Sequence, residues 1–245
     1  MMQLSSKKYI GGCGVLDAKR PASGCAATPK VFIRCASTPV PSDRSQRAIR
    51  FYLNSYHPLG ETEQGIMVAV QNRIPHFVDY SIRREPDFQN PFPSVTGLCR
   101  CDMFVGQAEA GDFIAYVTVK SAGPRRIVAI LQVLHKMPSH AAAADWYRRE
   151  GLDLPTNCVV HGNDGLPIAL AVPPKNFTTY AAWKAGYRWR SEHYPSFLIC
   201  RAVGGPELVN PPLVPDGIFG APFPNTRSPK QLTKTDFTKL RRLLP

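Results

Sequence analysis

The chain contains no apolar run near the roughly 18 residues that a membrane-spanning helix requires, which argues against an integral membrane protein. The seven cysteines include no Cys-x-x-Cys pair, and their odd number and irregular spacing do not indicate a disulfide framework. The apolar stretch at residues 9–16 is interrupted by three glycines and lacks the core of a signal peptide. These absences favour a cytoplasmic protein in a reducing compartment.

Acidic residues are scarce at both ends of the chain. Residues 1–50 hold nine Lys or Arg against two Asp or Glu, and residues 225–245 hold six against one, whereas the stretch between them is balanced. The formal net charge of +12 therefore comes from the two ends. Basic ends favour contact with an anionic polymer such as nucleic acid, and the alternative is that they serve solubility alone.

The length of 245 residues and the 44% hydrophobic content allow one large domain or two small ones. Residues 1–46 carry Gly, Pro, Ser and Thr with little periodicity, so we expect a disordered basic segment there. A transit peptide or a misplaced start would give the same pattern. Residues 47–245 are expected to form a single α+β domain with long loops, since prolines are frequent in them.

The most ordered-looking stretch lies at the centre of the chain. Residues 113–119 and 127–134 are short apolar runs rich in β-branched and aromatic residues, and a Gly-Pro turn separates them. This pattern predicts a β-hairpin. Neither run alternates with polar residues, so both faces should be covered. We therefore expect a small, strongly curved, barrel-like mixed sheet with two or three packed helices.

Other segments carry weaker strand signals. Alternation of Ile49, Phe51 and Leu53 predicts a first strand within residues 47–56, and residues 197–200 predict a late one. Residues 159–165 are expected to form a strand that enters an Asn-Asp-Gly turn. Residues 66–70 are a further short apolar run, and the proline-rich residues 73–93 are expected to be a loop of the kind that often binds ligands.

Three helices are predicted from capping residues. Ser139 is expected to cap a helix that ends before Gly151, and Thr178 or Thr179 a second one. Thr233 begins a capping-box pattern that predicts an amphipathic C-terminal helix. Its apolar face would consist of Phe237, Leu240 and Leu244.

Several short motifs occur in an order that resembles a known family. They are Asn90-Pro91-Phe92, the segment from Cys99 to Cys101, residues 107–113, residues 126–136 and Asp145-Trp146-Tyr147. This order is similar to the nucleotide modification associated domain family of type two, over roughly residues 49–244. That family occurs in bacteria and phages and is inferred to act in DNA base modification. The resemblance implies such a role and supplies no catalytic residues.

A binding pocket is expected between residues 90–101 and the central hairpin. In it, Asn90 would hydrogen-bond a base edge, Phe92 would stack on the base, and Arg125 and Arg126 would hold phosphate. The motif segments add three candidates, which are Cys99, Asp112 and Trp146.

A second aromatic feature lies in the later helix. Tyr180, Trp183 and Tyr187 recur at helical spacing and are expected to pack inward. Trp189 lies off that stripe between two arginines, which makes it the better candidate for an exposed, base-stacking ring.

The expected partner is nucleic acid, DNA by the family resemblance, or a nucleotide, with no cofactor and no membrane contact. Cys99 and Cys101 match no familiar zinc spacing, so no metal is expected and buried structural cysteines are favoured over a catalytic one. Two alternatives to a modified-base reader stay open. One is an enzyme that transfers or removes a group on a base or nucleotide, and the other is a protein-interaction domain without a small ligand.

Overall fold

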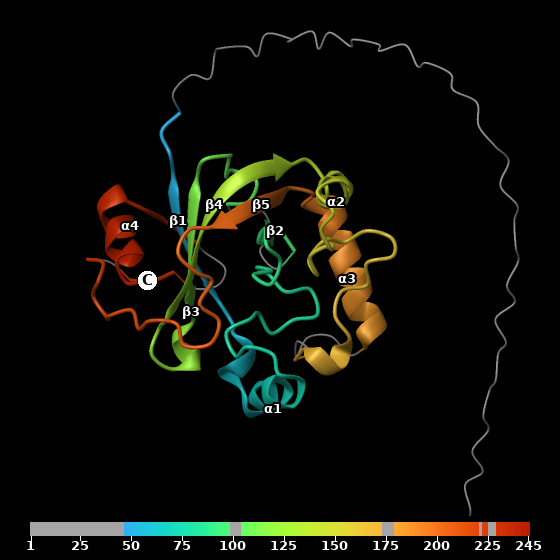
Figure 1. Ribbon diagram of the computed structural model, residues 1–245, viewed down its shortest axis with the longest axis horizontal. Coiled ribbons are helices and arrows are strands. Elements are labelled where there is room, and N and C mark those ends of the chain that lie inside the picture. Colours follow the sequence, from blue (N-terminus) through green and yellow to red (C-terminus); the bar gives the residue numbers. More distant parts are fainter. Residues whose placement is uncertain (1–46, 99–103, 173–178, 221, 225–228) are drawn as a thin grey trace, which may run out of the picture. The chain divides into compact units, whose positions relative to one another are not determined.

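The computed structural model describes residues 47–98, 104–172, 179–220, 222–224 and 229–245, and the expectations for residues 1–46 and for Cys99 and Cys101 fall outside them. The described residues form an α+β fold built on one six-stranded mixed sheet (Figure 1). The strands are β1 (Phe51–Tyr56), β2 (Ser94–Thr96), β3 (Phe113–Thr118), β4 (Ile127–Met137), β5 (Phe197–Ala202) and β6 (Lys230–Leu232).

The sheet has the strand order β2-β5-β4-β3-β1-β6, in which β1 and β3 are parallel and all other neighbours are antiparallel. The predicted first strand, central hairpin and late strand are confirmed as β1, β3–β4 and β5. In the hairpin Phe113 pairs with Gln132 and Val117 with Ile127. Gly123 lies within the connection and has a φ of 96°, a conformation that favours glycine.

The predicted barrel-like curvature is wrong, because the sheet is open and its edge strands β2 and β6 lie at opposite ends of the order. Both faces are nevertheless buried, as the lack of alternation indicated. Tyr52 and Tyr56 of β1 pack in one apolar layer, and Leu53 packs in the other. Two separate covering layers, rather than closure of the sheet, account for strands that are apolar on both sides.

Four α-helices occur in the described part, where two or three were expected. They are α1 (Glu63–Asn72), α2 (His140–Arg149), α3 (Tyr180–His193) and α4 (Lys234–Arg241). The residue before each helix caps it: its side-chain hydroxyl accepts a hydrogen bond from the backbone N–H three residues later. The capping residues of α1 to α4 are Thr62, Ser139, Thr179 and Thr233, in that order. The three predicted caps are confirmed, and residues 66–70 belong to α1. Three single 3₁₀ turns, Leu59–Glu61, Lys120–Ala122 and Ile168–Leu170, complete the elements.

The helices cover the sheet from different sides (Figure 1). The predicted amphipathic helix α4 buries Phe237, Leu240 and Leu244 in the layer that contains Leu53. Helix α2 packs against β5 in a separate cluster. Helix α3 buries Trp183 and Tyr187 as predicted, against residues of the loops rather than the sheet, whereas Tyr180 is exposed.

Residues 73–93 are irregular, as expected, but residues 81–88 lie inside the protein. Their polar groups are matched by specific partners. The Glu85 carboxylate accepts from the backbone N–H and the hydroxyl of Thr96, at 2.8 and 2.5 Å. The Asp87 carboxylate accepts from the N–H and hydroxyl of Thr156, at 2.6 and 2.8 Å. Satisfied partners allow this loop to be part of the core.

The predicted strand within residues 159–165 is wrong. Residues 159 and 160 have no ladder partner, and a turn occupies His161 and Gly162. Side chains from distant segments hold this stretch instead, as described below. No helix of the described part is long and apolar enough to cross a membrane.

Candidate functional site

An open cleft of about 1290 Å³ lies beside α3 and is here called the α3 cleft. It is lined by the N-terminus of α2, residues 159–164 and one face of α3, together with Arg83 and Pro195. The side chains that give it chemical character are Arg83, His140, His161, Asp164, Lys184, Arg188, Trp189 and Glu192. It is therefore a mixed polar cleft with both charge signs and one tryptophan.

The inner wall of the α3 cleft is held by Arg83, whose side chain is only 4% exposed. Its guanidinium donates to the backbone carbonyls of Thr156, Cys158 and Asn163, at 2.9, 3.1 and 2.6 Å. Burial lowers the pKa of Arg83, but an arginine starts so high that it remains charged. Its hydrogen bonds, rather than pairing with a neighbouring strand, hold residues 156–163 in place.

His140 is the first residue of α2 and is 3% exposed. Its Nδ1 accepts a hydrogen bond from the Val159 N–H at 3.1 Å. Burial, with a smaller contribution from Arg83, lowers the pKa of His140 to about 4. The ring is therefore neutral near pH 7 with its proton on Nε2. That Nε2 is buried, and a hydrogen bond between the ring and the Asn157 backbone partly offsets the lowering of the pKa.

The outer wall of the α3 cleft is formed by the exposed face of α3. Trp189 is 50% exposed, and its ring stacks on that of His193 with centroids 4.1 Å apart. Lys184 and Arg188, one helical turn apart, line the same cleft. The Lys184 ammonium pairs with the Asp164 carboxylate at 2.6 Å, and this pairing lowers the pKa of Asp164.

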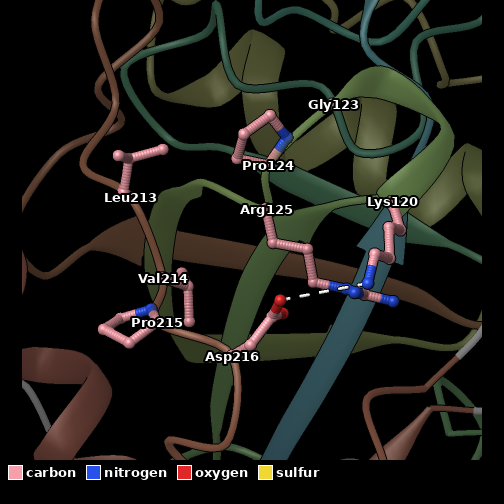
Figure 2. A pocket seen from close by; sticks show the side chains of 8 residues that line it. All are labelled: Lys120, Gly123, Pro124, Arg125, Leu213, Val214, Pro215 and Asp216. Atoms are coloured by element: carbon pink, nitrogen blue, oxygen red, sulfur yellow. Dashed lines mark ion pairs between the residues drawn. The ribbon is translucent and has the colours of Figure 1, made fainter.

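A second hollow of about 590 Å³ lies at the turn of the central hairpin and is here called the hairpin pocket (Figure 2). In Figure 2 the side chains of Lys120 and Arg125 extend toward Asp216, and Lys120 pairs with that carboxylate at 3.9 Å. Leu213 and Pro215 supply apolar surface. The ion pair is well exposed, so solvent screens it strongly.

The predicted ligand-binding residues do not converge in one pocket. Trp189 lines the α3 cleft and is exposed, as expected. Arg125 lines the hairpin pocket and lies over the Phe223 ring at 4.6 Å. The neighbouring Arg126 donates to the Pro211 carbonyl at 2.6 Å, so part of its guanidinium is engaged within the protein.

Two other candidates, Phe92 and Trp146, share a packed cluster on β5 and α2, and Asn90 lies just before Phe92 in the chain. Phe92 and Trp146 meet edge to face with centroids 5.3 Å apart, and Trp146 is buried. Asn90 donates to the Asp153 carbonyl at 2.8 Å and accepts from the Phe92 N–H at 3.2 Å. Each of these side chains therefore makes contacts within the protein that support its packing.

Asp112 lies at the start of β3, whereas Arg125 and Arg126 follow that strand, so they belong to opposite ends of the hairpin. The buried carboxylate of Asp112 pairs with Arg47 and accepts a hydrogen bond from the Arg50 N–H at 2.9 Å. Cys99 lies outside the described residues.

The described cysteines have the character of core residues. Cys158 and Cys200 are buried, and burial raises the pKa of the Cys158 thiol to about 12 and that of the Cys200 thiol further. A protonated, enclosed thiol is a poor nucleophile. Within the described ranges no group of three or more His, Cys, Asp or Glu side chains is arranged to hold a metal ion.

Sequence reasoning missed the role of Arg83 and of His140 in the α3 cleft. Ser139 was recognised as the cap, which already placed His140 at the first helical position, but no sequence signal linked it to Val159. Comparison of the chain with family models, with curated proteins and with solved structures gave no match.

Proposed function

We propose that this protein binds nucleic acid or a nucleotide through the α3 cleft, with the Trp189 ring stacking on a base. The observation that carries the proposal is Trp189 itself. A tryptophan that is 50% exposed, supported from behind by the His193 ring at 4.1 Å and placed at the wall of a cleft, has a free face for a planar ligand. Stacking of a base on such a ring is worth about 1–3 kcal/mol and tolerates any base.

The charge around the ring supports the same proposal. Arg188 and Lys184 line the cleft from α3, on the helix that carries Trp189. An aromatic ring beside cations suits a ligand that has a base and a phosphate. The basic chain ends described above add charge that attracts a phosphate backbone without reading its sequence.

The link to DNA base modification rests on the sequence resemblance alone. It leads us to propose that DNA is the polymer and that a modified base is preferred over an unmodified one. The α3 cleft, rather than the predicted pocket near residues 90–101, is the place where that preference would arise, since the Phe92 and Trp146 rings pack on each other.

The test is titration of the intact protein with fluorescent single-stranded DNA oligonucleotides, one unmodified and one carrying a modified base, at low and at moderate salt. Trp189→Ala should weaken binding by about 1–3 kcal/mol at both salt concentrations. Tyr180→Ala is the matched control, because Tyr180 is an exposed ring on the same helix that does not line the cleft. It should leave the affinity unchanged.

Three results separate the parts of the proposal. Absence of binding at low salt, where the electrostatic attraction is strongest, contradicts nucleic-acid binding. Equal losses in Trp189→Ala and Tyr180→Ala contradict the assignment of the α3 cleft. Equal affinity for the modified and unmodified oligonucleotides contradicts only the preference for a modified base.

A further inference from the structure

We propose that the hairpin pocket is a binding site for a small monocarboxylate with an apolar body, held through Arg125. The pocket shares no lining residue with the α3 cleft, and the inference does not rest on the proposed function. Its volume of about 590 Å³ is in the range of small-molecule sites, which are mostly apolar and hold a few placed polar groups. The sequence predicted phosphate as the partner of Arg125, and the surroundings of this side chain favour a carboxylate instead.

The two walls of the hairpin pocket are joined by their backbones. The Val214 N–H donates to the Arg125 carbonyl at 2.8 Å. The residues beside this pair, Arg126 and Leu213, form an isolated antiparallel bridge. The segment that follows residue 211 is therefore held against the residues just before β4. Walls that are joined in this way need not be ordered by the ligand, which favours binding.

Apolar side chains form much of the lining of the hairpin pocket. They are Pro124, Leu213, Val214 and Pro215. Leu213 is 53% exposed, so a ligand body that covers it removes apolar surface from water. The two proline rings lose no rotamer freedom when they are covered. This part of the pocket therefore favours an apolar ligand body over a fully polar one.

Arg125 supplies the charged contact of the pocket. Its guanidinium lies over the Phe223 ring, with the central carbon 4.6 Å from the ring centroid. Among the described residues, no hydrogen bond or ion pair holds the Arg125 side chain. A guanidinium that lies over a ring still presents N–H donors along its edge, where a carboxylate can accept two parallel hydrogen bonds.

The charges that line the hairpin pocket favour a monoanion. Lys120 and Arg125 are cationic and Asp216 is anionic, so the described lining carries one surplus positive charge (Figure 2). The Lys120 ammonium pairs with the Asp216 carboxylate at 3.9 Å, which leaves Arg125 as the cation for a ligand. A carboxylate matches this surplus. A phosphate monoester carries about two negative charges near pH 7, which exceeds the surplus and increases the repulsion from Asp216.

The experiment is an NMR titration of the full-length wild-type protein with phenylacetate, phenylacetamide, benzylphosphonate and acetate. Phenylacetate should shift the backbone amide signals of Gly123 and Arg125 saturably. The neutral amide should bind about tenfold or more weakly, as expected for the loss of hydrogen bonds to a charged group. Benzylphosphonate and acetate should also bind more weakly than phenylacetate. The amide of Gly111 is the matched control, because this glycine has the same φ of 96° at the opposite end of the hairpin.

Substitutions of the charged residues test the assignment of Arg125. In Arg125→Gln the preference for phenylacetate over phenylacetamide should fall toward one. Arg201→Gln is the matched control, because Arg201 is an exposed arginine of β5 that does not line the pocket, and it should leave the preference unchanged. Asp216→Asn removes the opposing charge and should strengthen phenylacetate binding several-fold. Asp216 is well exposed, so this variant should fold normally.

A further pair of variants tests the apolar part of the pocket. Leu213→Ala should weaken phenylacetate and phenylacetamide alike, because it removes surface that the shared ring covers. Val209→Ala is its control, since Val209 is an exposed apolar residue of the same segment that does not line the pocket. It should leave both affinities unchanged.

Four results would overturn the carboxylate site. They are the absence of a saturable shift at Gly123 and Arg125, equal affinity for phenylacetate and phenylacetamide, tighter binding of benzylphosphonate than of phenylacetate, and weaker phenylacetate binding in Asp216→Asn. Trp189→Ala should not change phenylacetate binding, because Trp189 does not line the hairpin pocket. The failure of either proposal therefore leaves the other one standing.

Discussion

Substitution of the two tryptophans on α3 should destabilise the protein to very different extents. Trp183 is 2% exposed and packs with Tyr187 and Ile82, whereas Trp189, six residues later, is 50% exposed. Trp183→Ala removes a buried ring and leaves a cavity, so it should destabilise the protein by about 3–5 kcal/mol. Trp189→Ala loses mainly its stacking on His193, so it should cost only about 1 kcal/mol.

Urea unfolding followed by far-ultraviolet circular dichroism measures the difference. With a urea dependence of ~2–3 kcal/mol/M, Trp183→Ala should lower the midpoint by about 1–2 M and Trp189→Ala by less than ~0.5 M. Trp183→Phe offers a milder change if the alanine variant does not fold. Quenching by iodide should fall most in Trp189→Ala, because the other described tryptophans, at positions 146 and 183, are buried.

The reasoning is refuted if Trp189→Ala is as destabilising as Trp183→Ala, or if its loss leaves iodide quenching unchanged. Either result would mean that the ring is packed and has no free face. The stacking role proposed for the α3 cleft would then have no physical basis.

Further predictions concern the rest of the chain. Deleting residues 1–46 should leave thermal unfolding cooperative, because the sequence of this segment has no periodic apolar face to bury. Cys158 and Cys200 should resist iodoacetamide at pH 8 until the protein unfolds, as peptide mass spectrometry can show, because burial raises the pKa of both thiols. Since the pKa of His140 is lowered from 6.5 to about 4, the unfolded chain binds a proton between these values that the folded chain does not. The free energy of unfolding should thus decline by about 3 kcal/mol as the pH falls through this window. Urea unfolding of His140→Phe should lack this part of the decline. Elemental analysis of protein purified without chelator should find well under one equivalent of zinc.

Local signals in the sequence predicted the elements that depend on local interactions. Ser139, Thr179 and Thr233 cap helices through N–H groups three residues away, so each cap is visible in the sequence itself. The hairpin was predictable for the same reason, since a short connection joins β3 and β4. The open form of the sheet was not predictable. Strands that are apolar on both faces have the same sequence pattern whether the sheet closes into a barrel or is covered by α4 and by loops.

The α3 cleft was beyond sequence reasoning because its wall depends on distant contacts. Arg83 reaches carbonyls more than 70 positions later, and His140 accepts from Val159 across 19 positions. Arginine side chains are mostly exposed in proteins, yet Arg83 and Arg84 are both buried. Only Trp189, whose place off the aromatic stripe of α3 is a local feature, could be assigned to its environment beforehand.

The pairing of β1 with β6 has a consequence for how the protein is made. β1 is the first strand of the sheet in the sequence and β6 the last, and Leu53 is buried beneath Phe237 and Leu240 of α4. During synthesis that apolar face stays uncovered until the final segment has left the ribosome. Contacts so far apart in sequence also slow folding. A nascent chain, or one cut short after residue 229, would expose this surface and become a target for chaperones or aggregation.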